Sequence, residues 1–324
     1  MRESAPPDRE KKGAVLVRLE GGIGDHVLGM RVLPFVRERF PGHPLVLMSD
    51  CGGHPVQAAI AAMSPLADEV VIARHRARVA DLKEMGRLEN LDEEASGLVK
   101  NAHAFIDTWG NQFFLEAATL LQVPFFEILA GRPTLAPSAA AEEAAARFLE
   151  PYAGHIVVAM SVSKFGKNLL AGCWETVLAP LLGWILADPR VVIFNLFTTR
   201  FAFPQWPPDA ARYRQTLIAE EVPLLHAMSA THDRIISAPD LDIEVVAALL
   251  RRSAYFIGVD NGLKHLAWAF NVPRTVLHPD MPDGVFALRW MPDFHRLLLF
   301  SAAQEQVRAH ARDACEAVAR ALSR

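Results

Sequence analysis

Cysteine is scarce in this chain of 324 residues, and the patterns that cysteine usually forms are missing. The three cysteines, Cys51, Cys173 and Cys315, lie far apart and include no Cys-x-x-Cys pair. This argues against a disulfide framework and a zinc cluster, and it favours a reducing compartment. The N-terminal residues are polar and lack the apolar segment of a signal peptide. We therefore expect a cytoplasmic protein.

Strong charge imbalance and long apolar runs are also missing. The formal net charge is -4, so the bulk electrostatics predict neither nucleic-acid binding nor recruitment to an anionic membrane. The most apolar stretch, residues 176–197, is interrupted by Asp188-Pro189-Arg190 and reads as a buried helix followed by a strand. We expect no transmembrane segment, and peripheral membrane contact stays open. Any site that binds an anion therefore depends on nearby residues and not on the overall charge.

The remaining composition is that of a globular protein, with 51% hydrophobic and 22% charged residues. Short β-branched runs alternate with amphipathic segments, which is typical of an α/β fold with a doubly wound parallel sheet. In the first half, the predicted strands are 13–19, 45–49, 69–73 and 104–107, and the predicted helices are 26–40, 56–63 and 114–122.

A second set of βα units follows an alanine-rich run. Residues 139–149 lie between two prolines and have the composition of a solvated connecting helix. We place the domain boundary there, which predicts domains 1–150 and 151–324. In the second half, the predicted strands are 156–161, 191–197, 235–237 and 255–258, the predicted helices are 174–186, 243–251 and 304–322, and 204–208 is a predicted loop.

A glycine-rich loop follows the first predicted strand. Ligands of parallel sheets bind at the carboxyl ends of the strands, so this loop is a candidate site. Gly22 and Gly24 allow the backbone to approach a ligand closely, and the next helix begins with free N–H groups. Asp25 would cap that helix or act as a general base. Both roles remain open on spacing alone.

The same loop has a rival interpretation as a dinucleotide fingerprint. Gly22 and Gly24 supply G-x-G, but Val27 occupies the third glycine position. Asp50, at the end of the second strand, would be the ribose-binding acid. An NAD-dependent oxidoreductase is therefore an alternative function.

Two loops of the second half are candidate phosphate sites. Asp260, Asn261, Gly262 and His265 lie between a strand and a helix, where backbone N–H groups suit a diphosphate. For His265, a packed structural histidine is the alternative. The other loop, residues 161–167, contains Ser163 and Lys167, and its alternative is a solvated basic loop.

Two blocks of the sequence resemble glycosyltransferase family 9, the bacterial heptosyltransferases. LVRLEGGIGDHVLGMRVLPFVRERFP is similar to the family's opening strand, its loop ending in Gly-Asp, and the proline-containing helix. YFIGVDNGLKHLAWAFNVPRTVL is similar to its Asp-Thr/Ser-Gly-x-x-His-Leu motif. Weaker matches are Asp107 with Gly110, and Lys167 with Trp174. The resemblance spans nearly the whole chain.

The resemblance implies a GT-B architecture, with two facing Rossmann-like domains that bind the acceptor and the nucleotide sugar. It also implies an inverting, metal-independent transfer without a cofactor. Asp25 falls on the family's proposed base, and Lys167 on its phosphate-binding lysine. The remaining positions implied for donor binding are Ser163, Asp260, Asn261, Gly262 and His265.

The chain departs from the family at the donor site and leaves the acceptor open. Asn261 replaces the usual Thr or Ser, and no ribose-contacting glutamate is found between Asn195 and Arg214. Arg74, Arg76 and Arg78 are candidate acceptor-binding residues, and a solvated basic loop is the alternative.

The expected partners are a nucleoside-diphosphate sugar and a sugar, glycolipid or protein acceptor. A non-catalytic nucleotide-sugar-binding or scaffold protein of the same fold is the remaining alternative.

Overall fold

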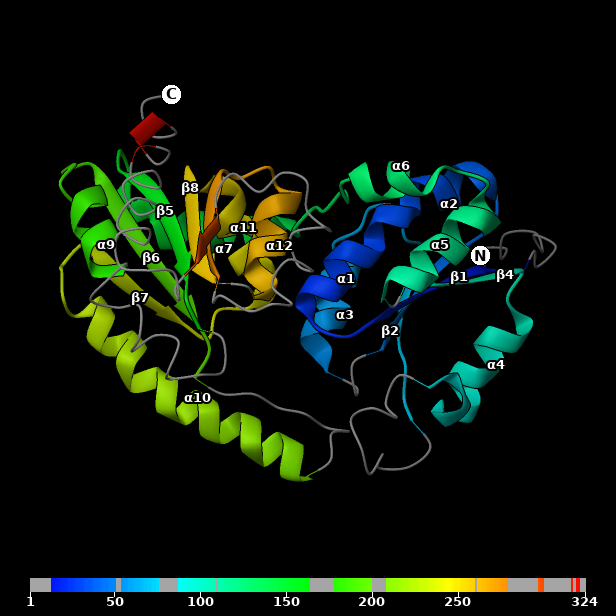
Figure 1. The fold of residues 1–324 in the computed structure, drawn as a ribbon. Helices are drawn as coiled ribbons and strands as arrows, with labels where there is room; N and C mark the ends of the chain where they lie inside the picture. The colour runs from blue at the N-terminus through cyan, green and yellow to red at the C-terminus, as the bar shows by residue number, and fades with distance from the viewer. Residues whose placement is uncertain are drawn as a thin grey trace, which may run out of the picture.

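Two lobes, each with a parallel sheet, make up the part of the chain that the computed structural model describes (Figure 1). That part comprises residues 13–50, 54–75, 87–108, 110–163, 178–199, 208–259, 261–278 and 297–299, with residues 316, 319 and 320. No described helix is both long and apolar enough to cross a membrane.

The first lobe has a four-stranded sheet in the order β3-β2-β1-β4. Its strands are β1 (Val15–Glu20), β2 (Leu45–Asp50), β3 (Glu69–Ile72) and β4 (Ala104–Asp107). Its helices are α1 (Ile23–Gly29), η1 (Met30–Val32), α2 (Leu33–Arg39), α3 (Pro55–Ala62), η3 (Leu88–Asn90), α4 (Glu93–Asn101), α5 (Gly110–Leu121) and α6 (Phe125–Ala130). All strand pairs are parallel, so the polar ends of β1, β2 and β4 meet at one edge.

The second lobe has a six-stranded sheet in the order β10-β9-β8-β5-β6-β7, also parallel. Its strands are β5 (Ile156–Ser161), β6 (Val191–Phe197), β7 (Ile235–Pro239), β8 (Tyr255–Val259), β9 (Arg274–His278) and β10 (Leu297–Leu299). Its helices are α7 (Ala139–Leu149), η4 (Glu150–Tyr152), α9 (Ala179–Ile185), α10 (Pro208–Ser229), α11 (Ile243–Arg252) and α12 (Gly262–Ala269).

One hydrophobic cluster runs from the first sheet to the second. It joins Leu19 and Val27 in the first lobe to Leu266, Trp268 and Phe194 in the second, and all five are almost fully buried. Helices α1 and α12 face each other between the lobes (Figure 1). The apolar periodicity of both helices therefore serves a shared core as well as their own sheets.

The helix predicted over 26–40 is interrupted in the structure. Helix α1 begins three residues earlier, at Ile23, a short 3-10 segment follows, and α2 starts at Leu33. Pro34 stands in the first turn of α2. A proline lacks the N–H for the preceding turn and clashes with the carbonyl four residues back, so an uninterrupted α-helix is disfavoured there.

Three helices were not predicted: α4, α6 and α10. Helix α4 begins at a capping aspartate, because the side chain of Asp92 accepts a hydrogen bond from the N–H of Ala95 at 2.8 Å. Helix α10 contains Pro223 in its interior. The loop predicted at 204–208 and the helix predicted at 304–322 lie almost entirely outside the described residues.

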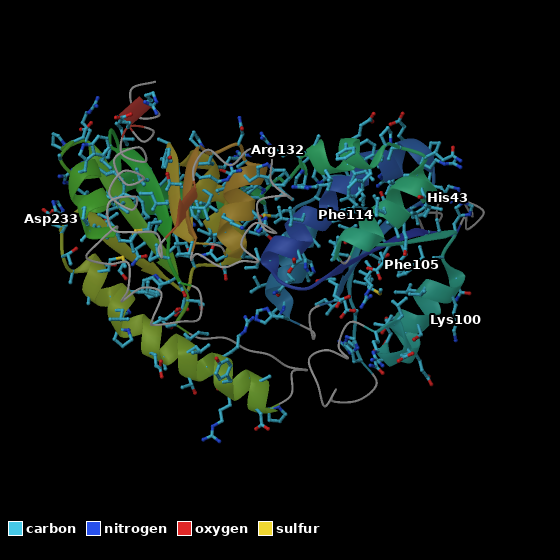
Figure 2. The ribbon with its side chains drawn as sticks, viewed as in Figure 1. His43, Lys100, Phe105, Phe114, Arg132 and Asp233 are labelled. Carbon is cyan, nitrogen blue, oxygen red and sulfur yellow. The ribbon has the colours of Figure 1, made fainter. Side chains whose placement is uncertain are left out.

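The alanine-rich segment forms α7, but it is not merely a solvated connector. Ala141 and Ala145 are buried, and Glu142 pairs with Arg251 and Arg252 of α11 at 3.0 and 2.8 Å. Helix α7 thus packs within the second lobe, and the chain crosses between the lobes before it, past Arg132 (Figure 2). The exact domain boundary stays a prediction.

Candidate active site

The two predicted glycine loops meet between the lobes. A Cβ atom at Gly24 would lie 2.6 Å from Cδ2 of His265, and one at Gly262 would lie 2.5 Å from Cβ of Ile23. Real Cβ atoms do not approach other atoms so closely, so glycine is required for this packing of α1 against α12. Segments separated by about 240 residues in the sequence are therefore brought to one place.

Asp25 lies in the first turn of α1 and is exposed. Its Oδ2 atom accepts a hydrogen bond from the N–H of Gly22 at 2.8 Å, which closes the turn. The helix begins before Asp25, so this residue is not the first capping position but the third helical residue. A capping contact and catalysis are compatible, because a carboxylate has two oxygens and each can accept more than one hydrogen bond.

His26, which the sequence analysis did not single out, contacts the backbone of the glycine loop. The ring is fully buried, with Nδ1 3.1 Å from the carbonyl oxygen of Gly22 and Nε2 2.8 Å from Oγ of Ser49. A carbonyl can only accept, so Nδ1 carries the proton and Nε2 accepts from the serine. Burial lowers the pKa of His26 to about 4, which keeps this neutral form.

The start of α12 is held by the side chain of Asn261. Its Oδ1 accepts from the N–H of Leu263 at 3.1 Å, as a helix cap does. Its Nδ2 donates to the carbonyl oxygens of Ser161 and Ser163 at 3.2 and 3.1 Å. The amide that departs from the family motif therefore ties the loop after β5 to the loop after β8.

Ser163 is brought next to a carboxylate from another element. Its hydroxyl donates to Oε2 of Glu221 at 2.7 Å. Glu221 is buried on α10, in a helix that the sequence did not predict. Two further predicted donor-binding residues, Lys167 and Asp260, lie outside the described residues.

A buried charge cluster occupies the carboxyl edge of the first sheet. Arg18 reaches Asp107 at 2.9 Å, Asp50 at 2.7 Å and Glu20 at 2.9 Å. The strand register explains this gathering, because Arg18 pairs with Asp107 across β1 and β4, and Glu20 with Asp50 across β1 and β2. His75 completes the cluster, with Nε2 2.9 Å from Asp50.

Glu20 is the member of this cluster nearest the glycine loop in sequence. Burial raises its pKa to about 7, although the positive charge of Arg18 opposes the rise. Gly21, which follows, adopts a φ of 93°, a left-handed conformation that favours glycine. The first lobe thus places a second carboxyl group, partly protonated near neutral pH, beside the loop that carries Asp25.

The structure disfavours the ribose-binding role considered for Asp50. Its side chain is 1% exposed, and its two oxygens face Arg18 and His75. A buried carboxylate whose oxygens already contact an arginine and a histidine is poorly placed to accept hydrogen bonds from ribose hydroxyls. The interpretation of the glycine loop as a dinucleotide site therefore has no acidic residue to bind the ribose.

Among the predicted acceptor-binding arginines, Arg74 is exposed at the end of β3, and its carbonyl oxygen accepts from the N–H of Asp92 at 2.7 Å. Arg76 and Arg78 lie outside the described residues.

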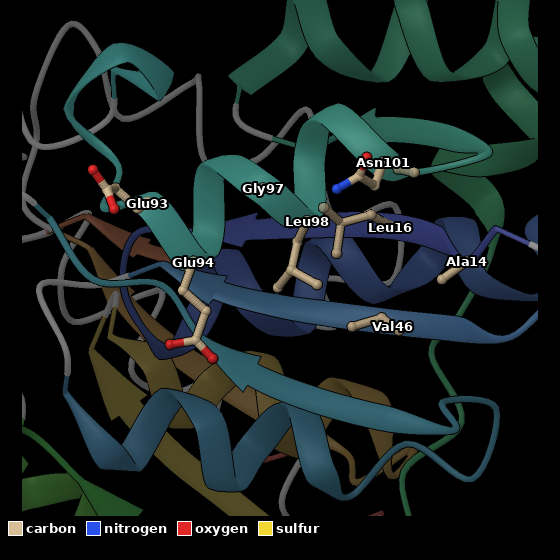
Figure 3. A pocket seen from close by; sticks show the side chains of 9 residues that line it. Ala14, Leu16, Val46, Glu93, Glu94, Gly97, Leu98 and Asn101 are labelled. Atoms are coloured by element: carbon tan, nitrogen blue, oxygen red, sulfur yellow. The ribbon is translucent and has the colours of Figure 1, made fainter.

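A cavity of about 400 Å³ lies elsewhere in the first lobe, between α4 and the sheet (Figure 3). Its floor is Ala14, Leu16 and Val46, near the amino ends of β1 and β2. No described candidate site residue lines it. In the described part of the chain, no group of His, Cys, Asp and Glu side chains could hold a metal ion.

Comparison with known proteins finds one matching family and several solved structures with a similar fold. Residues 206–286 match the model of glycosyltransferase family 9 (heptosyltransferase). The resemblance to this family is confirmed. No curated protein matches the chain. The matched segment contains α10, α11, β8 and α12, so it includes Glu221, Asn261, Gly262 and His265.

Two solved structures share the fold over nearly their whole length. A glycosyl transferase family 9 protein from Veillonella parvula has a TM-score of 0.63 and 11% identity, covering 94% of this chain and 98% of that one. ADP-heptose lipopolysaccharide heptosyltransferase II from E. coli has a TM-score of 0.60 and 11% identity, covering 95% and 98%. The chain has the GT-B fold. With the family match, this supports a nucleotide-sugar glycosyltransferase.

Proposed function

We propose that the chain is an inverting, metal-independent glycosyltransferase that moves a sugar from a nucleoside diphosphate to a hydroxyl acceptor. The meeting of the two glycine loops carries this proposal. Gly24 lies against His265 and Gly262 against Ile23, so a candidate base on one lobe stands beside a candidate diphosphate site on the other. The sugar donor of the E. coli neighbour, ADP-heptose, is the first one to test here.

Asp25 is the proposed general base. It takes the proton of the acceptor hydroxyl while the hydroxyl oxygen bonds to the anomeric carbon. The bond from that carbon to the diphosphate breaks at the same time, and the diphosphate leaves with the electron pair. Base and leaving group belong to different lobes and approach the carbon from opposite sides, which produces inversion.

The second lobe is proposed to hold the diphosphate. The first N–H groups of α12 have no carbonyl partners within the helix and favour an anion. His265 and Lys167 would donate to the phosphate oxygens, and Asp260 and Asn261 would shape the loop. Ser163 belongs to the same proposed donor site, and its hydroxyl donates to the buried carboxylate of Glu221.

Acceptor binding is assigned to the first lobe. Arg74, Arg76 and Arg78 would attract an anionic group of a sugar, glycolipid or protein acceptor. The two lobes thereby take the acceptor and the donor, and the chain passes from one lobe to the other before α7, ahead of the division predicted at residue 150.

A binding panel separates this function from its alternatives. Thermal unfolding is followed with ADP, GDP, UDP, ADP-heptose and NAD, since a ligand at 100 times its dissociation constant stabilises the native state by about 2.7 kcal/mol. We expect stabilisation by one nucleoside diphosphate and its sugar. Stabilisation by NAD alone would favour an oxidoreductase, and binding of a nucleotide sugar without turnover on any acceptor would favour a scaffold protein.

A further inference from the structure

A buried arginine of the first lobe lies against a buried tryptophan of the second. The guanidinium carbon of Arg31 is 4.4 Å from the centroid of the Trp268 ring. Arg31 is 0% exposed and Trp268 1% exposed. Contact between a cation and an aromatic face strengthens when water is excluded, so this pair is a strong point of attachment between the lobes.

Arg31 lies in the 3-10 segment η1 that follows α1, and Trp268 lies in α12. Arg31 follows Asp25 by six residues, and Trp268 follows Gly262 by six residues. At about 1.5 Å per residue in an α-helix and about 2 Å in a 3-10 segment, the pair lies roughly 10 Å along the chain from the candidate site. A shift of the backbone at this contact therefore has fewer than two helical turns to cross before it moves the site.

The site end of the same interface is closely packed, because a Cβ atom at Gly24 or Gly262 would overlap His265 or Ile23. Gly24 and Gly262 permit the close approach of α1 and α12, yet a glycine has no side chain with which to set a distance. The contact of Arg31 with Trp268 adds a second fixed point further along the interface. Trp268 suits this purpose, because Arg132, on the segment that joins the lobes, also lies 5.8 Å from its ring (Figure 2).

We infer that Arg31, through the ring of Trp268, is a positioning residue that sets the spacing of α1 and α12. It thereby sets the distance between Asp25 and the start of α12. The catalytic part of this inference rests on the proposed function, and the geometric part does not. Small misplacements of reacting groups cost a large fraction of the rate, so a loosened contact lowers turnover more than donor affinity.

Kinetic variants test the catalytic part. Arg31→Met removes the charge at similar length, Arg31→Lys keeps it, and Trp268→Phe keeps an aromatic ring. We expect Arg31→Met to lower kcat about tenfold or more. The Kd for the nucleoside diphosphate selected by the panel should change less than about threefold, because the second lobe alone holds it. Arg31→Lys should recover part of the rate.

Arg37→Met is the matched control. Arg37 binds the carbonyl oxygens of Leu66 and His43 and the carboxylate of Asp68, all within the first lobe. It should lower thermal stability without changing kcat. The double variant Arg31→Met with Trp268→Phe should be no slower than the slower single variant, because both remove one contact. Multiplying effects, or an unchanged kcat in Arg31→Met, overturn the inference.

A distance measurement tests the geometric part without activity. Spin labels are placed at Lys100→Cys and Asp233→Cys, two exposed positions on different lobes, in a chain whose three native cysteines are replaced by serine (Figure 2). We expect the distance distribution to broaden in Arg31→Met and Trp268→Phe but not in Arg37→Met. An unchanged distribution overturns the inference. If the distribution broadens as expected in the variants but the wild-type protein binds no nucleotide, only the proposed function fails.

Discussion

The carboxyl edges of the two sheets carry different polar groups. At the first edge, Glu20, Asp50 and Asp107 surround a single arginine, Arg18. At the second, between β5 and β8, the described groups are the hydroxyls and amide of Ser161, Ser163 and Asn261, with one carboxylate, Glu221, arriving from α10. Under the proposed function the diphosphate is bound at the second edge, because the carboxylates of the first edge would repel it. Equivalent positions in two similar sheets therefore take different roles.

The largest effect is expected from removing the central charge of the first edge. Arg18→Met leaves three carboxyl groups buried without their cation, and the unfolding free energy should fall by about 3 to 5 kcal/mol at pH 7. Urea unfolding measures the loss. The loss should shrink at pH 5, where Glu20, whose pKa burial raises to about 7, is protonated. Arg37→Met, which removes a half-exposed ion pair, should lower the unfolding free energy far less. An equal loss would mean that burial of the cluster adds nothing to the contribution of Arg18.

Asp25→Asn tests whether the first edge supplies the base. Asparagine can still accept the hydrogen bond from Gly22, so stability should hardly change. Turnover should fall at least about a hundredfold while donor affinity stays nearly constant, since the lost interaction belongs to the transition state. Steady-state kinetics and calorimetry measure the two quantities. Near-normal turnover would reduce Asp25 to a helix cap and make Glu20 the next candidate.

Lys167→Ala tests whether the second edge binds the diphosphate. Affinity for the nucleoside diphosphate should weaken by roughly 1.5 to 3 kcal/mol, the range for a hydrogen bond to a charged group. Lys164→Ala, in the same loop, is the matched control for general loss of positive charge. Equal losses in the two variants would indicate a diffuse basic loop instead of a specific contact.

A pH titration tests the neutral histidine beneath the glycine loop. The folded pKa of His26, about 4, lies below the unfolded value of 6.5. The native state therefore resists protonation, and stability that is full above pH 6.5 is lost as the pH falls toward 4. Between pH 7 and pH 5 this amounts to about 2 kcal/mol. In His26→Gln, denaturant unfolding should show that much less dependence on pH; an unaltered pH profile would contradict the assignment.

The smallest effect is expected at the exposed arginines. Replacing Arg74, Arg76 and Arg78 together by alanine should raise the acceptor KM severalfold and leave donor affinity intact, because the two ligands belong to different lobes. Exposed charges are screened by solvent, which limits the size of the effect. Acceptor titrations at low and high salt measure it. An equal change for both ligands would show that the assignment of lobes is wrong.

Local patterns predicted much of the fold. The buried strands β1, β2, β5, β6 and β8 were found from their β-branched runs, and Gly22, Gly24 and Gly262 from their place between a strand and a helix. Helix α4 could have been found as well, because Asp92 with two glutamates after it is a helix-start signal. Helix α10 was hidden by Pro223 and by its weak amphipathic pattern, since packing on the sheet overrides local propensity.

The sequence by itself determined the parallel α/β class, the two glycine loops and the candidate base. These depend on the periodicity of side chains and on the conformations open to glycine, which act over a few residues. Only the tertiary structure decided that Gly24 meets His265, that Arg18 gathers three carboxylates and that Arg31 lies on Trp268. Those contacts join distant segments, and they arise because strand register and the packing of two lobes on a shared core bring the segments together.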